Sequence, residues 1–446
     1  MRLRDAALAV AFGLGVAACT GTELPGDPAP DQPSPVAPVP SSPEVPSPTP
    51  KGPDSAVAAA ERLCEVPEPD LDSGSEVRAE GPTPALIAQV MRQVEQIRGF
   101  GYSERVVAEP VSQEEIGRDL LQYADIAYPR GQFARRSVAW DTIGVIPDGT
   151  SLRDAYESYG SGQVIGYYDT VSGELKFTGS ESPSPLERIT LAHELTHAID
   201  DQRFGLERLD VLGAECRDED AAAALALVEG NATFFMLRWA QTFLSAAEQV
   251  QVGIEAATQD TSTEGIPPFV TRLQAWPYDQ GMRFISALDS RGGLDAVDEA
   301  FRDLPASTEQ IIHPERYPND APTAVDVRDL SAALGEEWED LDVMAIGEAW
   351  LQIALGLRLD GSEAGTATSG WDGGTYRAWS DGSETAVVLS TAWDSPNDAR
   401  EFAAAMTDWI DQGDEHATVL ESDGTVVTAL FATDAATLET LHAAVA

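Results

Sequence analysis

Two histidines and a glutamate near the middle of the chain have the spacing of a metal-dependent hydrolytic site. Residues 193–197 read His-Glu-Leu-Thr-His, in a chain with only five histidines. On a helix, side chains four residues apart share one face, about 5–6 Å apart, so His193 and His197 can bind one metal ion. Glu194 would then lie beside the open coordination position, where a carboxylate can accept a proton from water. We therefore expect a Zn²⁺ site with Glu194 as general base.

The flanking residues predict a helix over residues 185–204 that carries this motif at its centre. Ser184 is suited to cap the N-terminus, Pro185 to occupy the first helical position, and Glu187 to complete a capping box. Gly205 offers a helix stop. The alternative interpretation is a solvated helix that carries two histidines by chance.

A zinc site of this kind needs a third protein ligand, and Glu229 is the favoured candidate. It interrupts an apolar run over residues 221–237, where a buried carboxylate is costly unless it is paired or bound to a metal. Glu215 and Glu219 remain alternatives, and Glu229 could instead pair with a buried arginine. Acids at the start of that helix, such as Asp218, are favoured by the helix dipole and usually stay solvated.

An HExxH motif followed by a glutamate on a later helix resembles the gluzincin metallopeptidases, the class that includes thermolysin. The chain is also similar to an uncharacterised group of bacterial secreted HExxH proteins over about residues 90–320. The matching stretches are Ile97–Gly99, Gly144–Pro147, Gln163–Asp169, Leu191–Ala198 with Asp201–Gln202, Leu227–Thr233, Pro277–Tyr278 and Ser307–Tyr317, with a weaker match near Gly370–Trp371. That group usually has aspartate at the position of Asn231, so the resemblance assigns no role to this residue.

The resemblance implies a zinc metallopeptidase that acts on peptides or proteins, with Glu229 as the third ligand. Such an enzyme also needs a donor that stabilises the oxyanion of the transition state. His313, Tyr317 and Tyr278 are the candidates, and His313 comes first because it lies in one of the matching stretches. A structural turn residue before Pro314 is the equal alternative for His313.

Two other functions remain open. The protein could be a non-catalytic, zinc-stabilised binding or scaffold lipoprotein, or it could be an amidase that acts on cell-wall material. An intact Glu194 favours hydrolysis over a binding role.

The N-terminus has the pattern of an export signal. Residues 1–18 combine arginines at the start with an apolar stretch from Ala6 to Val16, and Cys19 follows the small residues of a lipobox. We expect Cys19 to be lipidated and to anchor the chain on the extracytoplasmic side of a bacterial membrane, with ordinary secretion as the alternative. Residues 19–56 are rich in Pro and Ser, have almost no large apolar residues, and are expected to be a disordered tether.

The cysteines indicate the compartment in which the protein works, and the net charge excludes some classes of binding partner. With Cys19 lipidated, Cys64 and Cys216 form an even pair, and we expect a disulfide between them in an oxidising compartment. The chain has 75 acidic and 28 basic residues, a net charge of −47 and a pI near 4.1. This charge argues against binding of nucleic acid and against attraction to anionic lipids. The expected partners are a peptide or protein substrate and, through its lipid, the membrane.

The pattern of apolar residues predicts an α+β chain with two domains. Residues 57–335 should form a mainly helical domain with a small β-hairpin, which the resemblance makes zincin-like, and residues 336–446 a linker helix and an accessory ββαββα domain. The hairpin, from Val164–Tyr168 and Leu175–Thr178, would precede the metal-binding helix. In gluzincins such an edge holds the substrate backbone by β-pairing; a purely structural hairpin is the alternative.

The pattern of apolar residues also predicts further helices and strands in both domains. In the first domain the expected helices are Thr83–Arg98, Gln113–Ala127, Gly281–Leu288 and Leu294–Asp303. In the C-terminal domain the expected strands are Thr375–Trp379, Thr385–Thr391, His416–Ser422 and Val426–Ala432, and the expected helices Asn397–Ile410 and Ala435–Val445.

Overall fold

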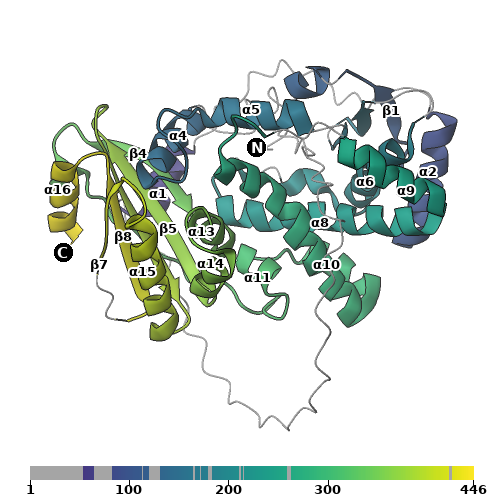
Figure 1. Ribbon diagram of the computed structural model, residues 1–446. Coiled ribbons are helices and arrows are strands. Elements are labelled where there is room, and N and C mark those ends of the chain that lie inside the picture. Colours follow the sequence, from purple (N-terminus) through teal and green to yellow (C-terminus); the bar gives the residue numbers. More distant parts are fainter. Residues whose placement is uncertain are drawn as a thin grey trace, which may run out of the picture.

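The structure, a computed structural model, describes residues 54–64, 83–112, 114–119, 131–163, 166–170, 172–178, 183–209, 212–213, 215–258, 263–420 and 424–445. The predicted signal peptide and Cys19 lie outside these residues, and so does the predicted tether as far as residue 53. The predicted fold class is confirmed: a mostly helical N-terminal region with a small sheet precedes a C-terminal antiparallel sheet with helices (Figure 1).

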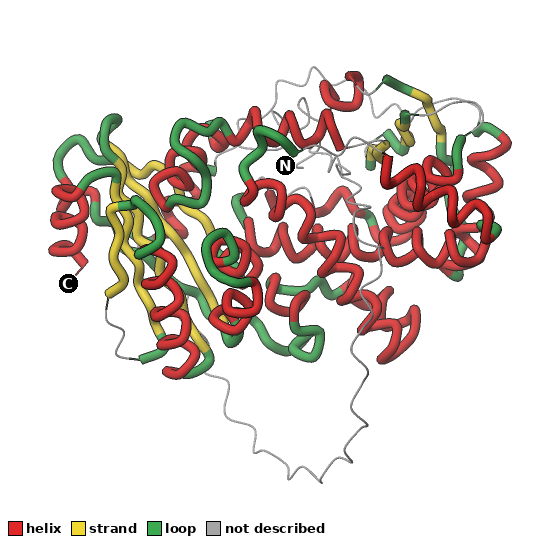
Figure 2. Tube along the Cα trace, in the orientation of Figure 1, coloured by secondary structure: helices red, strands yellow, loops and turns green. Residues whose placement is uncertain are grey.

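Long helices form the centre of the N-terminal region. They are α2 (Ala85–Arg98), α6 (Pro185–Phe204), α8 (Asp218–Phe243), α9 (Ala246–Thr258) and α10 (Pro268–Arg302). α8 packs extensively along α10 and also contacts α6, while α2 and α9 both pack against α6 (Figures 1 and 2). The helix with the HExxH motif is therefore enclosed by other helices.

The apolar composition of α8 is explained by its burial. By length and hydropathy it is the one helix among the described residues that could cross a membrane. A buried core helix passes the same test, and 61% of the apolar window of α8 is buried inside the protein. Its packing against α6 and α10 accounts for this sequence without a membrane.

α10 contains both of the helical segments expected between residues 281 and 303. Gly293, with φ 67° and ψ −163°, interrupts the helix between these two segments. The start at Pro268 was missed. Pro277 lies inside the helix, where a proline normally argues for a helix end, because it lacks the N–H that an interior position donates.

A three-stranded sheet packs against α6. Its strands are β1 (Val107–Pro110), β2 (Gly166–Asp169) and β3 (Glu174–Phe177), in the order β1-β3-β2. β2 and β3 form the predicted antiparallel hairpin, and β1 pairs with β3 in parallel. β2 is therefore an edge strand, and it contacts α6. The Tyr168 hydroxyl of β2 donates a hydrogen bond of 3.1 Å to Asp201 of α6, which fastens the hairpin to the helix.

The C-terminal region is built on a five-stranded antiparallel sheet. The strand order is β4-β5-β6-β8-β7, from β4 (Glu339–Ala345), β5 (Trp371–Ser380), β6 (Thr385–Trp393), β7 (His416–Leu420) and β8 (Val426–Ala432). With α15 (Pro396–Ile410) and α16 (Ala435–Val445), the last six elements follow the predicted ββαββα order. β4 was not predicted, and it extends the sheet by pairing with β5.

Both faces of this sheet are covered, and every residue of its central strand β6 is buried. Val387 and Leu389 of β6 belong to the main core, together with Phe402 of α15. Ala386 and Val388 point to the opposite face and join a second core with Leu441 of α16. Because side chains alternate along a strand, the two helices must lie on opposite faces of the sheet.

Shorter elements complete the two regions. They are α1 (Ala56–Leu63), α4 (Gln132–Ile143), α5 (Leu152–Gln163), η1 (Leu206–Leu209), α11 (Thr308–Ile312), α12 (Ser331–Leu334), α13 (Glu348–Leu355) and α14 (Gly361–Thr368). Of the predicted helix at residues 113–127, the described part is residues 114–119, and it is helical. α13 and α14 lie between β4 and β5, and the division of the chain into two domains with a linker helix stays a prediction.

Buried ion pairs and a disulfide join segments that are distant in sequence. Arg136 of α4 contacts both Asp218 at the start of α8 (2.6 Å) and Asp342 of β4 (3.1 Å). Cys64, at the end of α1, forms a disulfide with Cys216, with 5.9 Å between their Cα atoms. The disulfide that we expected is therefore present, and it ties the start of the described chain to the segment before α8.

Candidate metal centre

α6 has the boundaries that its capping residues predict. The Ser184 side chain accepts a hydrogen bond from the Glu187 backbone N–H (3.2 Å), and the Ser184 backbone N–H donates to the Glu187 carboxylate (2.6 Å). Gly205 ends the helix in the left-handed conformation, with φ 69°. The helix is buried along most of its length, so both motif histidines lie in the interior, with His193 0% and His197 2% exposed.

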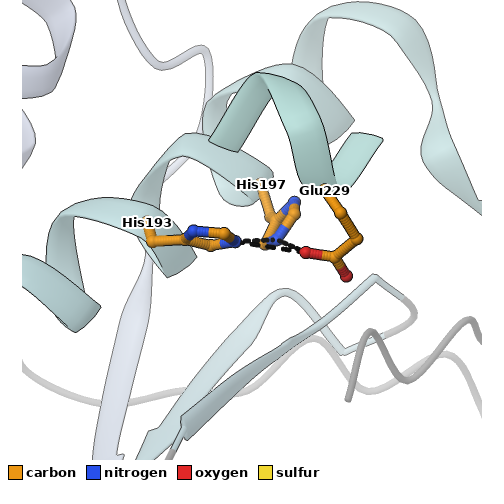
Figure 3. Close-up of side chains that lie close together, drawn as sticks. All are labelled: His193, His197 and Glu229. Carbon is orange, nitrogen blue, oxygen red and sulfur yellow. Dashed lines mark hydrogen bonds and ion pairs between the residues drawn. The ribbon is translucent and has the colours of Figure 1, made fainter. Parts of the chain in front are cut away.

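The two histidines and Glu229 converge at one point between α6 and α8 (Figure 3). The Nε2 atoms of His193 and His197 are 2.8 Å apart. Oε2 of Glu229 lies 3.3 Å from Nε2 of His193 and 3.5 Å from Nε2 of His197. All three side chains are buried. The structure thus brings together two imidazole nitrogens and one carboxylate oxygen from two helices.

Two observations indicate that these residues can hold a metal ion. Ligand atoms about 2.0–2.1 Å from a tetrahedral zinc lie about 3.3 Å from one another, which is close to the spacings between Glu229 and the histidines. In addition, the Glu229 side chain is 1% exposed, and its described partners are the two histidines and Tyr278 rather than a lysine or an arginine. A buried carboxylate is costly in that state, and a bound cation would remove the cost.

The other two acids considered as third ligand lie elsewhere. Glu219 and Glu229 are ten residues apart on α8, which is about 15 Å along a helix axis. Glu219 accepts hydrogen bonds from the backbone N–H (2.5 Å) and hydroxyl (2.7 Å) of Thr308. Glu215 is half exposed and lies 3.9 Å from Arg217. Of the three candidates for the third ligand, Glu229 is the one that lies next to both histidines.

Burial determines the protonation of the ligands. It lowers the pKa of His193 well below its ordinary value, and the neighbouring His197 adds to this effect. Burial also raises the pKa of Glu229, while His197 and Tyr278 oppose that rise. A neutral imidazole is the form of histidine that binds a metal ion, so a low histidine pKa favours this role at neutral pH.

Glu194 lies beside the ligand cluster without belonging to it. It is fully buried, and neither of its carboxylate oxygens has a hydrogen-bond partner at good geometry among the described residues. Burial raises its pKa well above the ordinary value, Glu229 adds to the rise, and the backbone N–H of Tyr168 opposes it. The carboxylate is therefore near both Glu229 and the edge strand β2.

Two tyrosines also lie close to the cluster of His193, His197 and Glu229. The ring of Tyr278, on α10, is 6.4 Å from the ring of His193. Burial raises the pKa of Tyr278 well above its ordinary value, and Glu229 is the next largest cause. Burial together with Glu229 raises the pKa of Tyr159, on α5, to about 12. Tyr278 was one of three candidate oxyanion donors, whereas Tyr159 was missed because no local pattern around it points to this site.

The other two candidate donors have partners outside the cluster. Nε2 of His313 lies 3.1 Å from Oε1 of the buried Glu348, at the start of α13. The hydrogen bond to Glu348 raises the pKa of His313, although burial opposes it. The Tyr317 hydroxyl donates to the backbone carbonyl of Asp303 (2.7 Å). Of the three candidates, Tyr278 is the one whose ring contacts a ligand histidine.

Comparison with known proteins finds one family, and it covers the C-terminal region. Residues 338–442 match a domain of unknown function (DUF8575). No curated protein and no solved structure matches the chain. The matched region begins at the strand β4 and contains none of the three clustered residues, so the match describes the C-terminal sheet and its helices and leaves the metal centre without a named family.

Proposed function

We propose that the protein is a zinc-dependent peptidase in which His193, His197 and Glu229 hold the metal and Glu194 is the general base. The observation that carries this proposal is the convergence of the three ligand atoms inside the fold, with the buried carboxylate of Glu194 beside them. Two histidines and one glutamate are a ligand set of catalytic zinc, which leaves one coordination position for water or substrate. The gluzincin-like order of these residues along the chain agrees with this assignment.

The chemistry follows from the positions of the side chains. A zinc ion held by three protein ligands supplies Lewis acidity, which polarises a carbonyl group and makes water acidic enough to lose a proton near neutral pH. Glu194 takes that proton as the water oxygen bonds to the carbonyl carbon. As the C–N bond breaks, Glu194 gives the proton to the leaving amine. One water is consumed, and the products are a carboxylic acid and an amine.

Tyr278 is the best-placed donor for the oxyanion that develops during this reaction. Its raised pKa keeps the hydroxyl protonated, which a hydrogen-bond donor requires. Its ring lies beside His193 and its side chain hydrogen-bonds Glu229, whereas His313 and Tyr317 bond to residues outside the cluster. Tyr278 therefore replaces His313 as the first candidate.

The edge strand β2 is the proposed binding site for the substrate backbone. It pairs with β3 on one side, and on the other side no described strand pairs with it. Its residue Tyr168 presents a backbone N–H near Glu194. An extended peptide that adds to this edge would bring its carbonyl groups close to the general base.

We also propose that the enzyme acts outside the cytoplasm, anchored by a lipid on Cys19. The disulfide between Cys64 and Cys216 is typical of oxidising compartments and supports this location. The N-terminal sequence pattern supports export and lipidation. A protein with Cys19→Ser should appear in the soluble fraction, whereas the wild type should partition into detergent.

The test of the proposed activity compares the wild-type chain with Glu194→Gln in digests of a peptide library, after zinc loading. Glutamine is nearly isosteric with glutamate but cannot accept the proton, so the variant should keep zinc and lose about 10²–10⁴-fold in rate. If neither protein cleaves any peptide or amide, the protein is not a peptidase and a binding role replaces the proposal. Equal cleavage by both would show that another residue is the base.

A further inference from the structure

A buried polar network lies beside the cluster of His193, His197 and Glu229 and connects four helices. Asp200 of α6 accepts hydrogen bonds on both carboxylate oxygens: from Nε of Arg98 on α2 (2.8 Å) and from the side-chain amide of Asn231 on α8 (2.5 Å). A second carboxylate, Asp298 of α10, pairs with the other side of Arg98 (2.5 Å). The Arg98 side chain is 0% exposed and that of Asp200 is 3% exposed.

The network joins the two helices that supply the ligands, close to the ligands themselves. Asp200 follows His197 by three residues on α6, which places it on the neighbouring turn of the same face. Asn231 follows Glu229 by two residues on α8. The single hydrogen bond from Asn231 to Asp200 therefore links the backbone segment that carries His197 to the segment that carries Glu229.

Arg98 cannot move without breaking several contacts. Its guanidinium group lies 4.6 Å from the ring centre of Phe100 and 5.1 Å from that of Phe235. These rings and the two carboxylates fix the position of the donor that holds Asp200. Asp200 is in turn close enough to His197 for the two side chains to interact electrostatically.

We propose that Asp200 is a positioning residue for the metal centre: its carboxylate, held by Arg98, sets the spacing of α6 and α8 and with it the separation of His197 from Glu229. This inference rests on the proposed metal site but not on peptidase activity. The side chains around a metal's ligands orient them, and their loss typically weakens metal binding about 10- to 100-fold.

An aspartate is required at this position by the hydrogen-bonding pattern. The Arg98 group is a donor only, and in the observed orientation the Asn231 amide also donates, so residue 200 must accept on both of its side-chain oxygens. An asparagine at residue 200 would turn an NH₂ group toward one of these donors. The negative charge that faces Arg98 would be lost, and the link to Asn231 would persist only if the Asn231 amide turned over, while the volume of the side chain stayed the same.

The experiment measures metal binding by the full-length chain, purified in detergent. Zn²⁺ affinity is obtained by competition with a chelator, and the geometry of the site from the visible absorption spectrum of the Co²⁺-loaded protein. The variants are Asp200→Asn and the milder Asn231→Ala, which leaves the buried pair of Arg98 and Asp200 intact. Asp298→Asn is the matched control, because it removes a carboxylate from the same arginine without touching the link between α6 and α8.

We expect Asp200→Asn to weaken Zn²⁺ binding about 10- to 100-fold and to change the Co²⁺ spectrum. Asn231→Ala should change both in the same direction, which keeps the inference testable if Asp200→Asn does not fold. Asp298→Asn should keep the wild-type spectrum and an affinity within about threefold of wild type, even if it lowers the unfolding temperature. A merely structural network would lower thermal stability in all three variants without altering the spectrum.

Two results overturn the inference. One of them leaves the proposed metal site and function intact, and the other rejects the metal site as well. If the wild type binds Zn²⁺ and the Asp200 and Asn231 variants match it in affinity and spectrum, the positioning role is wrong and the proposed function stands. If the wild type itself binds neither Zn²⁺ nor Co²⁺, the metal site and the inference fall together.

Discussion

Gly230 and Gly281 bring the backbones of α8 and α10 into direct contact, one residue beyond the ligand Glu229. A Cβ atom on Gly230 would lie 2.0 Å from the carbonyl carbon of Gly281, and one on Gly281 would lie 1.9 Å from the carbonyl oxygen of Ala226. Neither position therefore tolerates a side chain. Tyr278 precedes Gly281 by three residues, so this close approach is also what brings the tyrosine to the metal centre.

The first prediction concerns this contact. Gly230→Ala should destabilise the protein by at least about 1–3 kcal/mol, because two helix backbones would have to separate. Chemical denaturation measures the loss. The control is Gly253→Ala on α9, where a Cβ meets nothing within 4 Å; it should be neutral or stabilise by up to about 1 kcal/mol, since alanine favours helix over glycine. A Gly230→Ala protein as stable as the wild type would contradict the close approach.

The helix α6 and the place of His193 and His197 on it could be predicted from the sequence because their signals are local. The capping box at Ser184 and Glu187 and the stop at Gly205 all lie within or next to the helix that they delimit. Glu229 could be recognised because the apolar residues on both sides of it indicate burial. Periodicity also predicted the hairpin beside α6 and the last six elements of the C-terminal sheet.

Other features depend on contacts between distant segments and could not be predicted in this way. Tyr159 lies on α5, and nothing in its neighbourhood indicates that it faces Glu229. β4 was missed because its acids look solvated in the sequence. In the fold, Asp340 pairs with Arg377 of the next strand (2.7 Å) and Asp342 with Arg136 of α4 (3.1 Å), so both acids are satisfied by tertiary partners.

The second prediction distinguishes the candidate oxyanion donors. Tyr278→Phe should retain zinc but lower kcat about 10²–10³-fold, because it removes one donor from the site of developing charge. Tyr317→Phe is the matched control: its hydroxyl bonds the Asp303 carbonyl, so kcat should stay near the wild-type value. Steady-state kinetics on a peptide that the wild type cleaves measures kcat for each variant. Full activity of Tyr278→Phe combined with loss of activity in His313→Gln would return the role to His313.

The third prediction concerns pH and the acid at the start of α8. Burial raises the pKa of Glu219 to about 7 from an ordinary value of 4.5, with Asp220 and Glu348 adding to the rise and the hydrogen bonds from Thr308 opposing it. The folded state therefore binds this proton more tightly than the unfolded state. The stability it contributes is fully present below about pH 4.5 and is lost as the pH rises through about 7.

Replacing Glu219 by glutamine should remove this dependence, because glutamine keeps an oxygen for Thr308 but carries no charge. The free energy of unfolding of Glu219→Gln, relative to wild type, should increase between pH 5 and pH 9 by on the order of 2–3 kcal/mol. Glu215→Gln, which changes a half-exposed carboxylate shortly before the same helix, is the control and should leave the difference flat. A flat difference for Glu219→Gln as well would show that Glu219 is ionised in the folded protein.

The most direct test of the metal centre is the zinc content of the full-length chain after loading with Zn²⁺ and removal of excess metal. The wild type should hold about one zinc per chain, because three buried ligand atoms converge at one point. His193→Ala and Glu229→Gln should lose it, whereas Glu219→Gln, about 15 Å away along α8, should retain it. A wild-type chain without zinc would contradict the account, as would a Glu229→Gln variant that binds zinc as tightly as the wild type.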